Sequence, residues 1–94
     1  MITAKSRFET QNASKYLQQL CKHFAHKVSV EYDATSACAQ LPPGPARMKA
    51  DKTGLNFEIT GPDEASLSRA KFIIEDHLKR FAFREEPKGL TWSI

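Results

Sequence analysis

The stretch that decides the fold is residues 46–63, ARMKADKTGLNFEITGPD. Apolar residues occupy every second position of 46–50 and again of 55–59, with charged or polar residues between them, which is the period of a half-buried strand. Residues 51–54 have the composition of a turn, so we predict two consecutive strands of an antiparallel meander. Gly61-Pro62-Asp63 then ends the second strand and caps a helix.

Downstream of this cap, residues 63–82 are predicted to form the helix. Its apolar stripe recurs at spacings of three and four, and consists of Leu67, Ala70, Ile74, Leu78 and Phe81. Pro87 and Gly89 end any continuation, and residues 90–94 are a candidate final strand.

Upstream of residue 46, the same two periods alternate. Residues 2–9 alternate apolar and polar side chains, which predicts a half-buried strand. Residues 13–26 carry apolar side chains at helical spacing, which predicts an amphipathic helix with Asn12 as its N-cap. The period returns to two from Val28, and residues 37–41 are predicted to form a short strand that the three following prolines cannot continue.

The predicted order is strand, helix, four strands as a meander, helix and a short C-terminal strand. This order predicts an α+β fold, in which two helices cover one face of an antiparallel sheet and leave the other to water. It matches the half-repeat of TATA-box-binding-protein-like folds, an architectural likeness that carries no function. Because 94 residues are too few for two cores, we expect a single domain over residues 1–94.

Composition excludes several classes of protein. The formal net charge of +3 and the ordinary apolar content are typical of a globular chain. No run approaches about 18 apolar residues and no secretory leader is visible, so we expect a cytoplasmic protein without membrane binding. Cys21 and Cys38 form no C-x-x-C pair, which predicts free, reduced thiols and no zinc ribbon. No glycine motif for a phosphate or a dinucleotide is present, and no cofactor is indicated.

Histidine is the side chain most often recruited for proton transfer and metal ligation, so the three histidines are the candidate functional residues. His23 and His26 are neighbours at i and i+3 on the first predicted helix, but two ligands do not close a metal site. We therefore interpret them as a solvated or capping pair and predict no metal site. Cys21 points roughly 160° away from His23 on the helix and is expected to pack as a small hydrophobic residue.

His77 lies on the apolar stripe of the second helix, between Ala70, Ile73 and Phe81 in angle. A buried imidazole needs hydrogen-bond partners for its ring nitrogens. The structural interpretation is a core histidine bonded to the backbone or to a polar group of the first helix. The functional interpretation is a tuned acid or base in a small cleft. Arg84 is either a solvated residue at the helix end or an anion site beside His77.

The solvent-facing side of the predicted sheet carries charges of both signs. They comprise Lys5, Arg7, Arg47 and Lys49, interleaved with Glu9, Glu31, Asp33 and Glu58. Interleaved acids repel phosphates, and no outward aromatic side chain is predicted there for stacking on bases. We therefore predict no specific nucleic-acid binding, and the first helix, which lacks acids, remains the candidate basic surface.

Residues 14–27 and 76–85 resemble the two hallmark stretches of a bacterial family catalogued as domain of unknown function 2218. The likeness extends from residue 2 to Trp92. Residues 24–25 are Phe-Ala where a tryptophan is expected, and residues 41–44 are Leu-Pro-Pro-Gly where Leu-Pro-Phe-Gly is expected; both changes affect packing. The resemblance implies a small uncharacterised domain. Similar domains occur beside, or fused to, siderophore-interacting flavoproteins, which implies a role in iron–siderophore handling with such a flavoprotein as partner.

The leading hypothesis is a non-catalytic binding or accessory domain in iron–siderophore metabolism. In it, His23, His26, His77 and Arg84 line a site for a small anionic ligand or a metal chelate. Two alternatives stay open: a small enzyme with His77 as acid–base and Arg84 as anion clamp, or a protein–protein adaptor that uses the basic face of the first helix. The mutual distance of the three histidines discriminates, because convergence on one cleft favours a site and dispersion favours structural roles.

Overall fold

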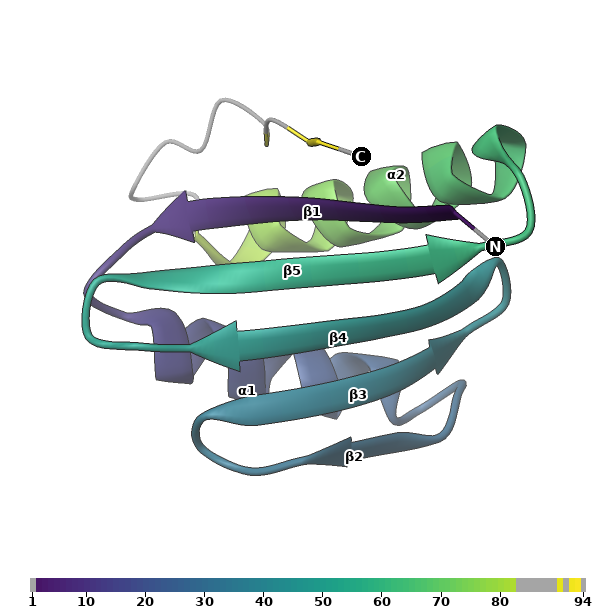
Figure 1. Cartoon of the computed structure of the whole chain (residues 1–94). Coiled ribbons are helices and arrows are strands. Elements are labelled where there is room, and N and C mark those ends of the chain that lie inside the picture. Colours follow the sequence, from purple (N-terminus) through teal and green to yellow (C-terminus); the bar gives the residue numbers. More distant parts are fainter. Residues whose placement is uncertain (1, 83–89, 91, 94) are drawn as a thin grey trace.

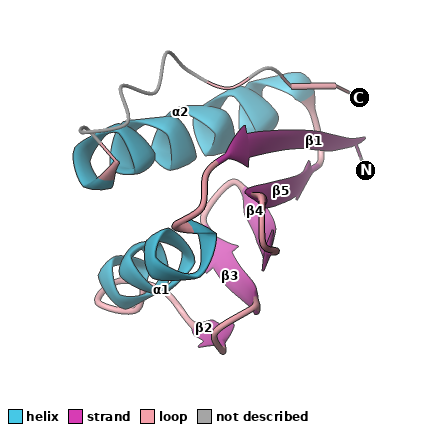
Figure 2. Ribbon diagram, turned by 90° about the vertical axis from the view of Figure 1, so that its left-hand side faces the viewer, coloured by secondary structure: helices cyan, strands magenta, loops and turns pink. Residues whose placement is uncertain are grey.

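The computed structural model describes residues 2–82, 90, 92 and 93. In chain order the elements are β1 (Ile2–Glu9), α1 (Ala13–Phe24), β2 (Val30–Tyr32), β3 (Ser36–Leu41), β4 (Gly44–Ala50), β5 (Gly54–Gly61) and α2 (Glu64–Phe81). The five strands form one antiparallel sheet in the order β1-β5-β4-β3-β2 (Figure 1). Both helices lie on the same side of that sheet (Figure 2), so the predicted α+β fold is confirmed.

The core lies between the sheet and the two helices. α1 packs over β2 to β5, and α2 packs over β1, β4 and β5. The largest fully buried side chains come from both helices and from β5, which lies between β1 and β4: Leu17, Leu20, Cys21, Leu55, Phe57, Ile59, Leu67, Ile74 and Leu78. Each of these falls on the apolar phase that the sequence predicted. Burial of one face of the sheet therefore fixes the positions of both helices and of the contact between them.

The strand boundaries differ from the sequence prediction at the proline-rich turn. β4 begins at Gly44, so Pro45 belongs to the strand and lies opposite Gln40 of β3. The register of β4 with β5 begins only at Ala46, so the missing N–H of Pro45 falls at the end of a strand, where proline is tolerated. β2 is also shorter than predicted: it begins at Val30, because the Val28 amide instead donates to the carbonyl of Phe24.

The two helix starts use different means of satisfying the free amides. Asp63 caps α2 as predicted, and its carboxylate accepts a 2.8 Å hydrogen bond from the Ser66 amide, which lowers the pKa of Asp63. Asn12 occupies the cap position of α1 as predicted, but its side chain does not make the expected capping hydrogen bond. α1 ends at Phe24, and His26 therefore lies just beyond the helix rather than within it.

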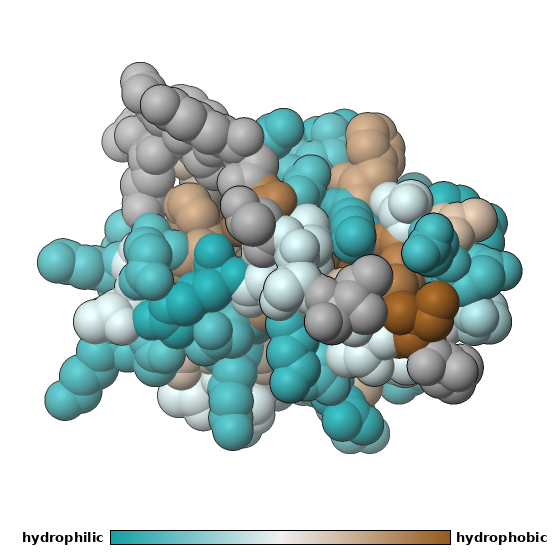
Figure 3. All heavy atoms as spheres, turned by 45° about the horizontal axis from the view of Figure 1, so that its top comes forward, coloured by the Kyte–Doolittle hydropathy of each residue, from teal (hydrophilic) through white to brown (hydrophobic). Residues whose placement is uncertain are grey.

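The described part of the C-terminal segment runs along the free edge of β1. Lys5 and Ser93 exchange two backbone hydrogen bonds of 2.8 and 2.9 Å, which form an isolated bridge within the predicted strand 90–94, of which residues 91 and 94 lie outside the described residues. Seen from the side of β1 and α2 (Figure 3), the surface is mainly hydrophilic, with separate apolar patches. Neither helix among the described residues is long and apolar enough to cross a membrane.

Candidate functional site

Packing of α1 against α2 brings His23 and His77 together. The centroids of their rings are 4.5 Å apart, and the ring of Phe24 meets His77 edge-on at 5.1 Å. His23 also contacts the ring of Phe81 at a centroid distance of 6.0 Å. The two imidazoles are separated by 53 intervening residues of chain, so their contact is a product of the tertiary fold.

These two histidines open onto a cleft, which we call the histidine cleft. It has a volume of about 210 Å³, and its lining consists of His23, Phe24, Lys27, Val28, Leu41, Pro42, Ile73 and His77. The walls are apolar except for the two imidazoles and the exposed Lys27. The lining also includes Leu41 at the end of β3 and Pro42 in the turn that follows, and the sequence analysis did not connect either residue with function. The position of that turn beside α2 depends on the register of the sheet, which the sequence pattern does not specify.

The ring of His77 is fixed by the backbone of its own helix. Its Nδ1 lies 2.6 Å from the carbonyl oxygen of Ile73, one turn earlier. A carbonyl can only accept a hydrogen bond, so Nδ1 carries a proton and Nε2 is the nitrogen left for another partner. His77 is half-buried rather than enclosed in the core. The expected backbone partner is thus present, on α2 itself.

The surroundings of His23 disfavour the protonated form of its imidazole. Its partial burial lowers its pKa below the ordinary histidine value, and the neighbouring His77 lowers it further. His26, Lys27 and Arg80 add smaller effects in the same direction, because each places positive charge near the ring. The neutral imidazole is therefore favoured at His23, and a neutral imidazole can both donate and accept a hydrogen bond.

The remaining predicted site residues do not join this pair. His26 is exposed and does not line the histidine cleft. Arg84 lies outside the described residues. Cys21 is buried and its burial raises the pKa of its thiol to about 11, as suits a small core residue. Within the described ranges, no group of three or more His, Cys, Asp or Glu side chains is arranged to hold a metal ion.

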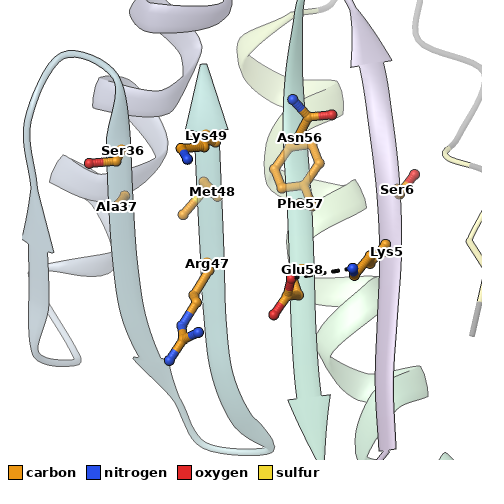
Figure 4. Close-up of a pocket in the computed structure, with 10 residues that line it drawn as sticks. All are labelled: Lys5, Ser6, Ser36, Ala37, Arg47, Met48, Lys49, Asn56, Phe57 and Glu58. Carbon is orange, nitrogen blue, oxygen red and sulfur yellow. Dashed lines mark ion pairs between the residues drawn. The ribbon is translucent and has the colours of Figure 1, made fainter. Parts of the chain in front are cut away.

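A larger and shallower hollow, of about 380 Å³, lies on the uncovered face of the sheet (Figure 4). The register aligns one row across all five strands: Lys5, Glu58, Arg47, Cys38 and Glu31. Lys5 and Glu58 form an ion pair of 3.9 Å. Charges of opposite sign therefore alternate along this row, as expected from the sequence, and we consider this hollow a weaker candidate than the histidine cleft.

Fold and site define a small α+β domain with two helices on a five-stranded antiparallel sheet. The chain belongs to the family described as an uncharacterized protein conserved in bacteria (DUF2218), whose model matches residues 5–93. It is similar to a solved structure, the NMR structure of PA4090 from Pseudomonas aeruginosa, at 28% identity and a TM-score of 0.82. That likeness covers 99% of this chain and 96% of the other. No curated protein matches the chain.

Proposed function

We propose that this domain is a non-catalytic binding module that takes a small, planar, anionic ligand in the histidine cleft. The observation that carries the proposal is the approach of the His23 and His77 ring centroids to 4.5 Å in the lining of an apolar cleft. Two polar rings set in apolar walls are the usual composition of a ligand site, in which a few polar groups fix the orientation of the ligand.

The size of the cleft limits the ligand. A protein cavity of about 150 Å³ is enough to hold benzene, so the 210 Å³ of the histidine cleft suits a single substituted aromatic ring. Phe24 and Ile73 offer apolar walls for the ring, and Lys27 offers a cation for an acidic substituent. The two imidazoles supply hydrogen bonds to hydroxyl groups. A dihydroxybenzoate has each of these features.

The setting we propose is iron–siderophore handling, with a siderophore-interacting flavoprotein as partner. It follows from the family resemblance and from the chemistry of the ligand that the cleft suits, because a catechol chelates ferric iron through its two hydroxyl oxygens. Two histidines without a third protein ligand do not form a structural metal site. Any metal at the cleft would therefore arrive already chelated.

A titration with 2,3-dihydroxybenzoate, followed in ¹H–¹⁵N NMR spectra, tests this function. We expect saturable shifts at His23, Lys27 and His77, and a binding constant weakened about tenfold or more in His77→Phe, which keeps the ring and removes its nitrogens. His26→Ala serves as the matched control, because His26 is exposed outside the cleft. Shifts that are absent, or that the two variants affect equally, would refute the proposal.

One observation favours the enzyme alternative. The hydrogen bond from His77 Nδ1 to Ile73 holds the ring and leaves Nε2 free, as in a histidine that transfers protons. Among the described lining residues, however, no carboxylate, hydroxyl or thiol accompanies it. Conversion of the added compound during the titration, lost in His77→Phe, would establish the enzyme in place of the binding module.

A further inference from the structure

One side of α2 exposes a large aromatic residue. Phe72 is 69% exposed, the most exposed large hydrophobic side chain of the described chain. It borders a shallow hollow of about 390 Å³, whose lining consists of Ser68, Arg69, Phe72 and Ile73. Figure 2 shows α2 with the sheet on one side and α1 below it, so another side of the helix has no described element against it. A single exposed apolar side chain is common on protein surfaces, so the inference rests on the hollow beside Phe72 and on the charges that flank it.

We infer that this surface is the interface of a homodimer, in which two copies of α2 pack antiparallel about a two-fold axis. Residues spaced by three and four along the helix share one stripe, which here contains Ala65, Arg69, Phe72, Ile73, Asp76 and Arg80. Interfaces with two-fold symmetry must be self-complementary. In this dimer the hollow of each protomer receives Phe72 of its partner.

The order of residues along this stripe supplies that complementarity. When the axis passes between Phe72 and Ile73, Phe72 of each copy lies against Ile73 of the other. In the same register Arg69 faces Asp76 of the second copy, twice over, once on each side of the axis. Opposite charges thus flank a central apolar contact, and Ala65 of each copy lies opposite Arg80 of the other, where its small side chain leaves room for the longer one. Parallel packing would instead place like residues opposite one another.

The charged groups are accessible for this pairing. Arg69 is exposed, and its described hydrogen bond, from Nη2 to the Ser66 hydroxyl, is long at 3.5 Å. Asp76 is paired with Arg80 at 3.1 Å within the helix, and one of its oxygens can accept a second cation. A contact between two single helix faces buries an area at the small end of the range for protein interfaces, so the dimer is weak and depends on concentration. It adjoins the histidine cleft through Ile73 but needs no ligand there.

Sedimentation of the full chain from about 10 μM to about 1 mM, a range suited to weak interfaces, tests the inference. We expect the wild type to pass from monomer to dimer. Phe72→Ala, Arg69→Glu and Asp76→Arg should each raise the dissociation constant about tenfold or more. The double variant Arg69→Glu/Asp76→Arg should recover most of the affinity, because it restores opposite charges in the antiparallel register.

Lys52→Glu is the matched charge-reversal control, since Lys52 is exposed in the turn between β4 and β5, and it should dimerise as the wild type does. The NMR spectrum of each variant verifies that the monomer stays folded, as expected for exposed positions. A monomer throughout the concentration range overturns the inference. So does a dimer that Phe72→Ala leaves unchanged, or a double variant as weak as the single ones.

Discussion

The indole Nε1–H of Trp92 donates a 2.8 Å hydrogen bond to Oε1 of Glu75 on α2. The same carboxylate oxygen accepts a 3.2 Å hydrogen bond from the backbone amide of Leu90. The Trp92 ring also packs near Phe57 of β5, with ring centroids 6.3 Å apart. Glu75 therefore ties the described C-terminal residues to the helix layer, and a carboxylate acceptor makes the stronger kind of hydrogen bond.

Loss of this acceptor should release the indole. Because Trp92 is the one tryptophan of the chain, its fluorescence reports on it alone. In Glu75→Ala we expect emission shifted to the red and stronger quenching by iodide. Glu75→Gln keeps an acceptor oxygen and should behave nearly as the wild type does. Equal emission in the two variants would mean that the hydrogen bond does not hold Trp92 in place.

Arg7 and Asp51 make stability depend on acid pH. Two guanidinium nitrogens of Arg7 bond the two Asp51 oxygens at 2.9 and 3.1 Å, which links β1 to the turn between β4 and β5. This contact, followed by the Thr53 amide, holds the pKa of Asp51 well below its usual range. A carboxyl with a lowered folded-state pKa contributes stability that is full above its unfolded value and is lost as the pH falls through the folded one.

Thermal unfolding between about pH 5 and pH 2 measures this contribution. We expect the wild type to lose stability over that range and Arg7→Ala to lose less, because the variant has already lost the main partner of Asp51. Lys5→Ala is the control, since its exposed 3.9 Å pair with Glu58 is of the kind that contributes little. Parallel pH curves for wild type and Arg7→Ala would contradict the prediction.

Gly44 admits no side chain. A Cβ at this position would overlap the backbone carbonyl oxygen of Thr60 on β5. Gly44→Ala must therefore displace the start of β4, and we expect a loss of more than about 2 kcal/mol in the free energy of unfolding. At Gly54 the added carbon would meet the end of the Arg7 side chain at 2.7 Å, which can move. Denaturant unfolding should accordingly show a smaller loss for Gly54→Ala than for Gly44→Ala.

The titration of His23 should reflect its neighbours. Burial and then His77 lower the pKa of His23, so the stability it supports is full above the ordinary value of 6.5 and falls as the pH drops through the lowered one. Ring-proton NMR should give a midpoint below 6.5 in the wild type. In His77→Ala, which removes the neighbouring imidazole and admits water, the midpoint of His23 should move upward. A midpoint unchanged by that substitution would show that the two rings do not interact.

Local pattern predicted most of the elements. The alternation within residues 46–50 and 55–59 depends only on which side chains face water, so β4 and β5 were predictable, as was the Asp63 cap of α2. The missing capping hydrogen bond of Asn12 and the strand position of Pro45 depend on the neighbouring backbone. Sequence periodicity does not report on neighbours that are distant in the chain.

The candidate site likewise has one part that the sequence determined and one that only the tertiary structure decided. The sequence by itself determined that His77 lies near an apolar stripe and that Cys21 packs inward, because helical phase is set by residue spacing. Only the tertiary structure decided that His23, and not His26, meets His77, because that contact depends on how α1 and α2 sit together on the sheet. A phase is a property of one segment, whereas a cleft requires the registers of several segments to be fixed at once.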